Sequence, residues 1–235
     1  MTTSDFQLLS QSSMRRAVAR AMSKSKREAP HFYVSGEAHL DHLFRRLEAV
    51  NDGRSDDDRI SLTAVLVHVT AGALLAHPHL NAHWTEEGLA LVDGVHVGVA
   101  VAVDDGLIAP AVLDCAELDV LTISQRLRDL AARARAGRLR VDEISEPTFT
   151  ISNLGMYEVS RFTAIVNPPQ VAILATGAAE QRAIVVDGVV VPGTVMAMTL
   201  SADHRAIDGV AAGQFLAMVR RGLETPSGLK WGTEI

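Results

Sequence analysis

The chain has 235 residues, a net charge of −6 and a hydrophobic fraction of 48%, with only 4% aromatic residues. This aliphatic content is sufficient for a substantial core, so it excludes a disordered chain, and the acidic balance argues against nucleic acid as the main partner. Cys115 is the only cysteine, which excludes an intrachain disulfide and a cysteine-based metal cluster.

The sequence shows no targeting signal and no membrane-spanning segment. Residues 1–10 lack the charged start and apolar stretch of a secretory signal. The longest apolar region, residues 62–76, is about one turn short of a bilayer span and contains polar residues, so it predicts a buried helix. We therefore expect a cytoplasmic chain with no membrane partner.

The first half of the chain alternates between helical and extended patterns. Ser12 and Ser13 precede a predicted helix that begins at Met14 and ends before Pro30. Further along we expect a strand at 31–38, an amphipathic helix at 40–50 and an acidic loop at 51–59. A buried helix that Ser61 caps follows, and after it we expect strands at 81–84, 89–92, 95–103 and 107–112.

The second half is richer in strands. A long helix is expected at 118–139, strands at 148–152, 171–177, 182–191 and 194–202, and a final helix from Gly209 to about Leu223. Asp187 and Gly188 suit a two-residue type I′ turn, because glycine tolerates a positive φ. The pattern predicts one α/β domain with a mixed β-sheet flanked by helices, spanning 1–235 with a core of about 8–223.

One histidine stands where catalytic chemistry is expected. His204 follows an apolar strand and precedes a helix that begins with glycine, and Asp208 lies four residues further on. A histidine at such a junction is suited to general base catalysis, since its ordinary pKa of about 6.5 lies near working pH. No histidine spacing suited to seating a metal on one helix face occurs, so we expect no metal site.

A second string contributes a hydroxyl. Residues 149–155 read FTISNLG, which places Ser152 at the end of a predicted strand before a glycine turn. Ser152 would serve as a donor to the oxyanion that forms during acyl transfer. The alternative is turn chemistry, in which serine and asparagine satisfy their own backbone.

With both strings in view, the chain resembles the catalytic domain of dihydrolipoamide acyltransferases, the acyl-transferring core of 2-oxo acid dehydrogenase complexes. The similarity is dispersed over nearly the whole chain. The matching strings are residues 14–19, 29–32, 62–67, 77–82 and 97–101, and most densely 149–155, 162–170 and 203–209.

The resemblance implies a chloramphenicol-acetyltransferase-like fold and a homotrimer whose active sites lie between subunits, with coenzyme A (CoA) and the acceptor entering a channel from opposite ends. It implies His204 as general base, Ser152 as oxyanion donor, and Asp208 as support for the active-site loop, with Arg15 as its partner and Arg16 as the second choice. As CoA contacts we expect Asn167, Lys24 and Lys26 from position and charge, with plain solvation as the open alternative for the two lysines.

One departure decides the expected acceptor. Full-length family members carry lipoyl and peripheral-subunit-binding domains before this core, whereas here the core begins about ten residues after Met1. We therefore expect a stand-alone O-acetyltransferase that moves an acyl group, most simply acetyl, from acetyl-CoA to a small-molecule hydroxyl in specialised metabolism. One alternative is a dihydrolipoyl transacylase core acting on a lipoyl domain in trans, and another is a non-catalytic oligomeric scaffold.

Overall fold

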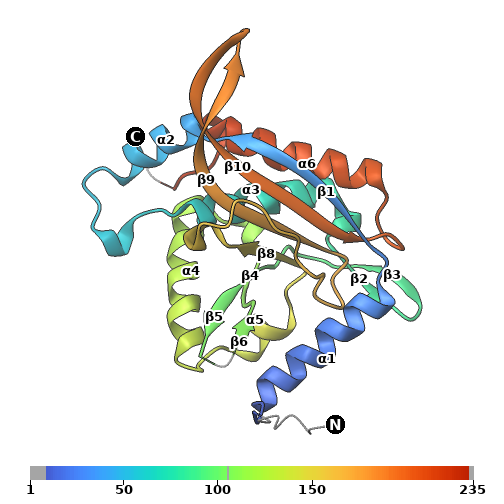
Figure 1. Ribbon diagram of the computed structural model, residues 1–235. Helices are drawn as coiled ribbons and strands as arrows, with labels where there is room; N and C mark the ends of the chain where they lie inside the picture. Colours follow the sequence, from blue (N-terminus) through green and yellow to red (C-terminus); the bar gives the residue numbers. More distant parts are fainter. Residues whose placement is uncertain (1–8, 105, 233–235) are drawn as a thin grey trace, which may run out of the picture.

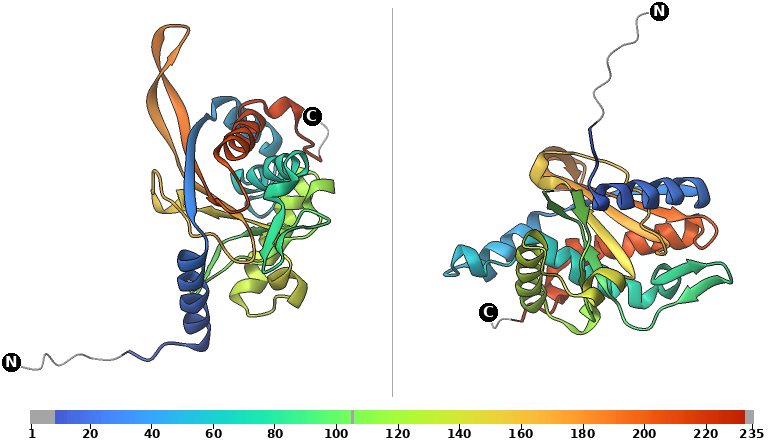
Figure 2. Two further views of the ribbon diagram at one scale, coloured as in Figure 1. Left: turned by 90° about the vertical axis from the view of Figure 1, so that its right-hand side faces the viewer. Right: turned by 90° about the horizontal axis from the view of Figure 1, so that it is seen from below.

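A six-stranded mixed sheet organises the molecule, in the order β1-β10-β9-β8-β4-β7. The computed structural model describes residues 9–104 and 106–232. Strand β8 runs parallel to both of its neighbours, and the other strand pairs of the sheet are antiparallel. Helices cover one face of this sheet, as Figures 1 and 2 show.

The bounds of the elements are as follows. The helices are α1 (Ser13–Glu28), α2 (Asp41–Asn51), α3 (Leu62–Ala76), α4 (Val120–Arg135), α5 (Val141–Ser145) and α6 (Gly209–Glu224). The strands of the main sheet are β1 (His31–His39), β4 (Val97–Val99), β7 (Ala111–Val112), β8 (Phe149–Asn153), β9 (Ala172–Val186) and β10 (Val189–Asp203). Two small hairpins pair β2 (Ala82–Thr85) with β3 (Gly88–Leu91) and β5 (Val101–Val103) with β6 (Gly106–Ile108).

Helix α3 lies at the centre of the core, as its uniformly apolar sequence predicts. Nine of its residues are buried, and Ser61 accepts a hydrogen bond from the Ala64 N–H at its start. The segment Asp56–Ala76 is long and apolar enough to cross a membrane, but 56% of its apolar window is buried inside the protein. Its packing is therefore that of a core helix.

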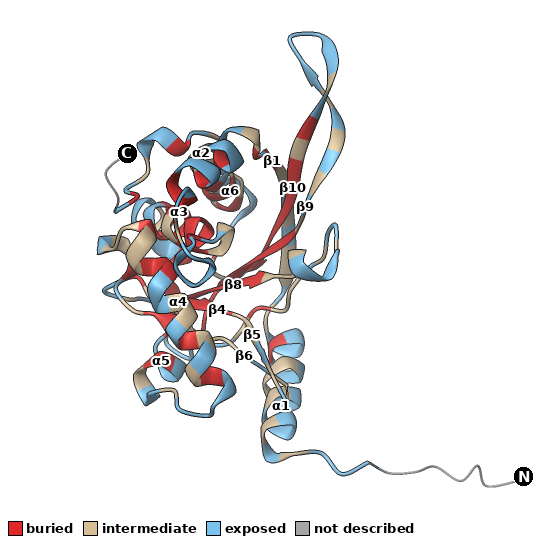
Figure 3. Ribbon diagram, turned by 90° about the vertical axis from the view of Figure 1, so that its left-hand side faces the viewer, coloured by how far each residue is buried: buried red, intermediate tan, exposed pale blue. Residues whose placement is uncertain are grey.

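Helix α1 stands away from the body of the molecule. The predicted cap is confirmed at its start, where the Ser12 side chain accepts from the Arg15 N–H. Most of its side chains are exposed, and Ser25 near its end is buried (Figure 3). An isolated helix of this length has marginal stability in water, so α1 needs packing partners along its length.

Several predicted strands have other bounds in the structure. The strand expected at 95–103 is broken at Ala100, because β4 joins the main sheet whereas β5 pairs with β6. The strand expected at 107–112 is divided in the same way between β6 and β7. The separate strands expected at 171–177 and 182–191 are wrong: β9 runs continuously to Val186, and β10 begins after the confirmed turn at Asp187 and Gly188, both of positive φ.

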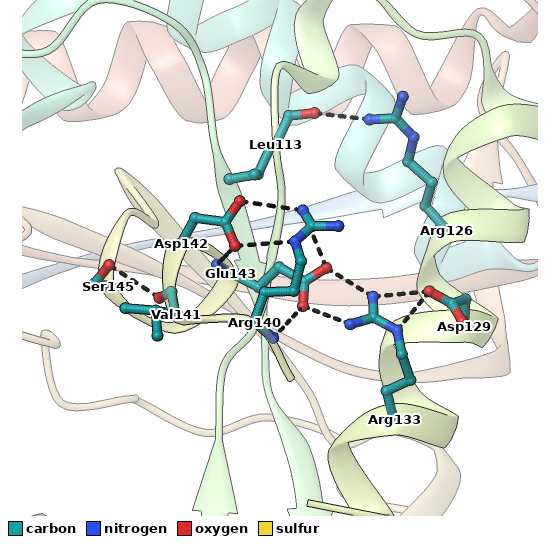
Figure 4. Close-up of polar contacts among 9 residues, drawn as sticks. All are labelled: Leu113, Arg126, Asp129, Arg133, Arg140, Val141, Asp142, Glu143 and Ser145. Atoms are coloured by element: carbon teal, nitrogen blue, oxygen red, sulfur yellow. Dashed lines mark hydrogen bonds and ion pairs between the residues drawn. The ribbon is translucent and has the colours of Figure 1, made fainter. Parts of the chain in front are cut away.

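The expected helix at 118–139 is shorter, and α5 was not predicted. A network of ion pairs fastens α5 to α4 (Figure 4). The buried Glu143 carboxylate accepts two hydrogen bonds of 2.6 Å from Arg133 and one of 2.8 Å from the Arg140 N–H. Arg133 also donates to Asp129. Helix α5 is thus held by charge rather than by apolar contact, which explains why a hydrophobic pattern misses it.

Cys115 is buried, and burial raises the pKa of its thiol to about 12. A thiol with such a pKa stays protonated near neutral pH and is a poor nucleophile. This agrees with an inert role for the cysteine.

We predict that Glu143→Gln lowers the free energy of unfolding by about 2–3 kcal/mol, since it leaves Arg133 without its buried partner. Arg133 also lowers the pKa of Glu143 below its ordinary 4.5. The ion pair therefore stabilises the wild type above pH 4.5 and is lost as the pH falls through the lowered pKa. Urea unfolding between pH 3 and 7 should show this acid loss in the wild type and a flatter profile in the variant.

The matched control is Asp142→Asn on the same short helix. The Asp142 side chain is 39% exposed and pairs with the exposed Arg140, so its loss should lower the free energy of unfolding much less than the loss of Glu143. Equal losses in the two variants would contradict the special role of Glu143.

Candidate active site

Ser152 lies on β8, one residue before the strand ends. The neighbouring Asn153 accepts from the Gly155 N–H at 2.8 Å and donates to the Thr63 hydroxyl at 3.3 Å. The Ser152 hydroxyl has no hydrogen-bond partner among the described residues, although the residue is only 9% exposed. The asparagine thus performs the turn chemistry, and the serine remains free to donate.

Two cavities meet at Ser152. One has a volume of about 670 Å³ and lies between α4, β5 and the residues that follow β8; its charged lining is Arg59, Arg128, Arg135 and Asp56. The other, of about 530 Å³, is apolar and runs beneath α1, with Val18 and Met22 in its wall. A basic chamber and an apolar chamber therefore share one free hydroxyl.

His204 lies at the far end of β10. Its N–H donates to the Pro30 carbonyl at 3.1 Å, and its exposed ring packs against Phe32 with the ring centroids 4.6 Å apart. Within the described ranges, neither ring nitrogen has a hydrogen-bond partner. The imidazole is thus available to an incoming group.

The sheet register keeps Ser152 and His204 apart in one chain. Ser152 pairs with Ala175, and Ala175 pairs with Thr199 on β10. His204 follows Thr199 by five residues, which is roughly 16 Å along the strand, and two strand spacings add about 10 Å across the sheet. The two side chains therefore cannot reach one reacting atom within a single copy.

Asp208 lies at the start of α6, where its carboxylate accepts from the Ala211 N–H at 2.8 Å. Arg15 lies near the opposite end of α1 from Pro30, roughly 20 Å away by helix rise. No ion pair between Arg15 and Asp208 forms within the part of one chain that the structure covers. Asp208 thus caps α6 just after the turn that carries His204, and its expected pairing with Arg15 does not form among the described residues of one chain.

The three residues expected to bind CoA lie in different places. Asn167 lines the apolar cavity. Lys24 lies 3.9 Å from Glu28 beside a third cavity of about 300 Å³, and Lys26 donates to the Tyr33 hydroxyl. The two lysines and the asparagine are therefore not gathered around one chamber of a single chain.

Sequence reasoning missed the arginines of the basic chamber. Arg128 and Arg135 lie seven residues apart on α4, and Arg128 donates to the Arg59 carbonyl at 2.8 Å. In the described part of the chain, none of these three side chains forms an ion pair. The signal that could have found them is the recurrence of arginine along the helix predicted at 118–139.

A strap, residues 154–170, forms a wall of the apolar cavity on the side of the sheet away from the helices (Figure 2). The Val159 carbonyl accepts from the Ala178 N–H at 2.8 Å, and Arg161 pairs with Glu37 at 2.8 Å. A side chain at Gly177 would place its Cβ 2.1 Å from the Ser160 carbonyl oxygen. Glycine is thus required there for the strap to approach the sheet.

The site has the parts of an acyltransferase: a free hydroxyl at the junction of two substrate-sized cavities, and a histidine at a strand end. Residues 3–230 match the model of the family described as 2-oxoacid dehydrogenases acyltransferase (catalytic domain). The chain belongs to this family, which confirms the predicted resemblance and enzyme class.

The relatives agree with this assignment. The chain is 36% identical over 225 residues to the dihydrolipoyllysine-residue acetyltransferase component of the pyruvate dehydrogenase complex of Rickettsia felis, covering 95% of this chain and 55% of the relative. The chain therefore spans about half the length of the curated relatives it matches.

Solved structures give the same family. A probable dihydrolipoamide acetyltransferase from Listeria monocytogenes superposes with a TM-score of 0.89 at 28% identity, covering 94% of this chain and 95% of that one. The Azotobacter vinelandii dihydrolipoamide acetyltransferase, solved to study a serine, a histidine and an asparagine in its catalytic mechanism, gives 0.88 at 27%, covering 94% and 92%.

A more distant similarity concerns the fold alone. A chloramphenicol acetyltransferase superposes with a TM-score of 0.58 at 15% identity, over 87% of this chain and 94% of the other. The predicted fold class, a chloramphenicol-acetyltransferase-like mixed sheet flanked by helices, is confirmed.

Proposed function

We propose that this chain is a dihydrolipoyl acyltransferase core, which moves an acetyl-type group between a dihydrolipoyl thiol and the thiol of CoA. The observation that carries the proposal is the free hydroxyl of Ser152 where a basic and an apolar chamber meet. The basic chamber suits the phosphates of CoA, and the apolar one suits the hydrocarbon arm of a lipoyl group.

In the proposed reaction, His204 removes the proton from the CoA thiol as its sulfur attacks the carbonyl carbon of the acyl-dihydrolipoyl thioester. The new carbon–sulfur bond places negative charge on the carbonyl oxygen, and the Ser152 hydroxyl donates to it. Collapse of this intermediate breaks the old carbon–sulfur bond. The departing lipoyl sulfur takes the proton back from His204, so no net proton is consumed.

The relatives support this thiol acceptor over a small-molecule hydroxyl, the acceptor first expected. The Rickettsia relatives are named as dihydrolipoyllysine-residue acetyltransferases, and the chloramphenicol acetyltransferase resembles the chain at the level of fold alone. The intervals between the serine, histidine and asparagine of the Azotobacter enzyme equal those between Ser152, His204 and Asp208. This chain has aspartate where that enzyme has asparagine.

We further propose a homotrimer in which each active site takes Ser152 from one copy and His204 from the next. The separation of the two side chains within one copy supports this arrangement. The exposure of α1 supports it as well, because a neighbouring copy would supply the packing that this helix lacks. In such an assembly Arg15 of one copy and Asp208 of the next would lie at the same site.

For CoA we propose that Arg59, Arg128 and Arg135 contact its phosphates, since guanidinium groups suit phosphate oxygens. Their lack of ion pairs within the described ranges supports this role. The lysines first expected, Lys24 and Lys26, stay a rival prediction.

The reaction itself is tested by following acetyl transfer between acetyl-CoA and dihydrolipoamide, with hydroxyl acceptors assayed in parallel. We expect transfer to dihydrolipoamide, a loss in kcat of about 10²–10⁴-fold in His204→Ala, and a loss of about 10²–10³-fold in Ser152→Ala. Transfer to hydroxyls alone would contradict the proposed acceptor, and an unchanged rate in His204→Ala would contradict the base.

The shared site is tested by mixing two inactive variants. Co-refolded or co-expressed Ser152→Ala and His204→Ala chains should regain activity, because roughly a quarter of the sites in a randomly mixed cyclic trimer combine an intact serine with an intact histidine. The same proteins mixed after separate assembly serve as the control. A site contained within one copy predicts no recovery in either mixture.

The CoA contacts are tested with Arg128→Gln and Arg135→Gln. Each should raise the KM for CoA by about 10-fold, since a charge-assisted hydrogen bond contributes about 1.5 kcal/mol, and should leave the KM for dihydrolipoamide unchanged. The exposed Arg138, which lies outside the basic chamber, provides the control Arg138→Gln. Equal effects with 3′-dephospho-CoA would place the contact on the diphosphate, and a rise confined to Lys24→Gln or Lys26→Gln would favour the lysines instead.

A further inference from the structure

The residues on either side of His204 form an ion pair with each other. The Arg205 guanidinium donates to both carboxylate oxygens of Asp203, with its shortest bond at 2.6 Å, and the Arg205 N–H donates to the same carboxylate at 3.0 Å. Asp203 is only 2% exposed. This pair ties residue 203 to residue 205 and leaves the residue between them at the apex of a closed turn.

An aromatic ring packs against the partly exposed Arg205 side chain. The Arg205 guanidinium lies 4.6 Å from the centroid of the Trp84 ring. The backbone N–H of Trp84 donates to the Pro169 carbonyl at 2.8 Å. A cation held against an indole face is attracted by the negative face of the ring. The β2–β3 hairpin thus contacts the turn that carries His204, although the hairpin and the turn are far apart in sequence.

Other charged groups face Arg205 from α1. Glu28 and Lys24 line the same 300 Å³ cavity as Arg205 and Trp84, and Glu28 adds to the raised pKa that Asp203 causes in Arg205. Arg205 therefore remains charged. The positive charges of Arg205 and Lys24 are balanced by the negative charges of Asp203 and Glu28, so this cluster has no net positive charge that would attract a substrate anion. Its surroundings are those of a structural clamp.

Within the described residues of one copy, no side chain forms a hydrogen bond with the His204 ring. Catalytic histidines are commonly oriented by a carboxylate hydrogen-bonded to one ring nitrogen. Here Asp208 is occupied at the start of α6, and within the covered residues the imidazole has only ring packing against Phe32. Within one copy, the backbone of the turn and the packing on Phe32 are therefore what set the direction of the ring.

We propose that Arg205 and Trp84 are positioning residues for His204, acting through the buried Asp203 carboxylate. The inference rests on the proposed function, in which His204 is the general base. The ion pair between Asp203 and Arg205 holds one end of the catalytic turn, and the cap that Asp208 forms at the start of α6 holds the other end. The base is thereby oriented without a direct hydrogen bond to its ring.

The test uses Arg205→Lys, which keeps the charge but loses the forked contact, and Trp84→Phe and Trp84→Ala, which shrink and remove the ring face. We expect Arg205→Lys and Trp84→Ala to lower kcat by about 10–100-fold with both KM values within twofold of wild type, since small misplacements of a catalytic group cost rates of this size. Trp84→Phe should retain most of the activity. Arg220→Gln, on the exposed face of α6, is the matched control.

Two further measurements separate positioning from general damage. Guanidinium chloride at millimolar concentration should restore part of the kcat of Arg205→Ala, and urea at the same concentration should not. In protein labelled at histidine ¹³Cε1, the His204 resonance, assigned by its absence in His204→Ala, should broaden or split in Arg205→Lys and stay single in Arg220→Gln.

The outcomes are distinct. An unchanged kcat together with an unchanged His204 resonance would overturn the proposal, as would a rise in the KM for CoA at constant kcat, which would make Arg205 a substrate contact. An inactive wild type would contradict the proposed function instead, and the resonance would still report whether the clamp orients the ring.

Discussion

The register of three neighbouring strands is the constraint on which the rest of the site depends. Parallel pairing of β8 with β9 and antiparallel pairing of β9 with β10 set Ser152 level with Thr199. Backbone hydrogen bonds fix this alignment along the whole sheet, and a slip by one residue would turn every buried side chain to the wrong face. The position of the serine, the distance to the histidine and the meeting of two chambers at one hydroxyl all follow from it.

The two faces of the sheet contribute differently. On one face, α3 and α6 bury the aliphatic side chains that supply most of the hydrophobic stabilisation. On the other, polar contacts hold the strap: Ser25 donates to the Val166 carbonyl at 2.6 Å, and the Val166 N–H donates to the His31 ring at 3.0 Å. The fold thus separates the element that stabilises it from the element that shapes the substrate chamber.

Much of the fold could be predicted because its signals are local. Ser12 and Ser61 mark the starts of their helices, and the glycine after Asp187 predicts the turn there. The uniform apolar pattern of α3 predicts that this helix is buried. The break at Ala100 could not be predicted, because it depends on which strands β4 and β5 find as partners. His204 and Ser152 likewise stand out as candidates in short strings, whereas the arginine-lined chamber requires Arg59 and Arg128, 69 residues apart, to meet in space.

The close approach at Gly177 has a consequence for how ligands move. At Gly177 the backbone of the strap lies directly against β9 because no Cβ separates them, so the strap is fixed to the sheet at this point. A strap fixed in this way is poorly suited to swing open as a lid, which would leave the ends of the two cavities as the routes of entry and exit. Such a passage favours long, thin substrates that thread in end-on, and it makes the width of the passage, rather than a conformational change, the filter on what can react.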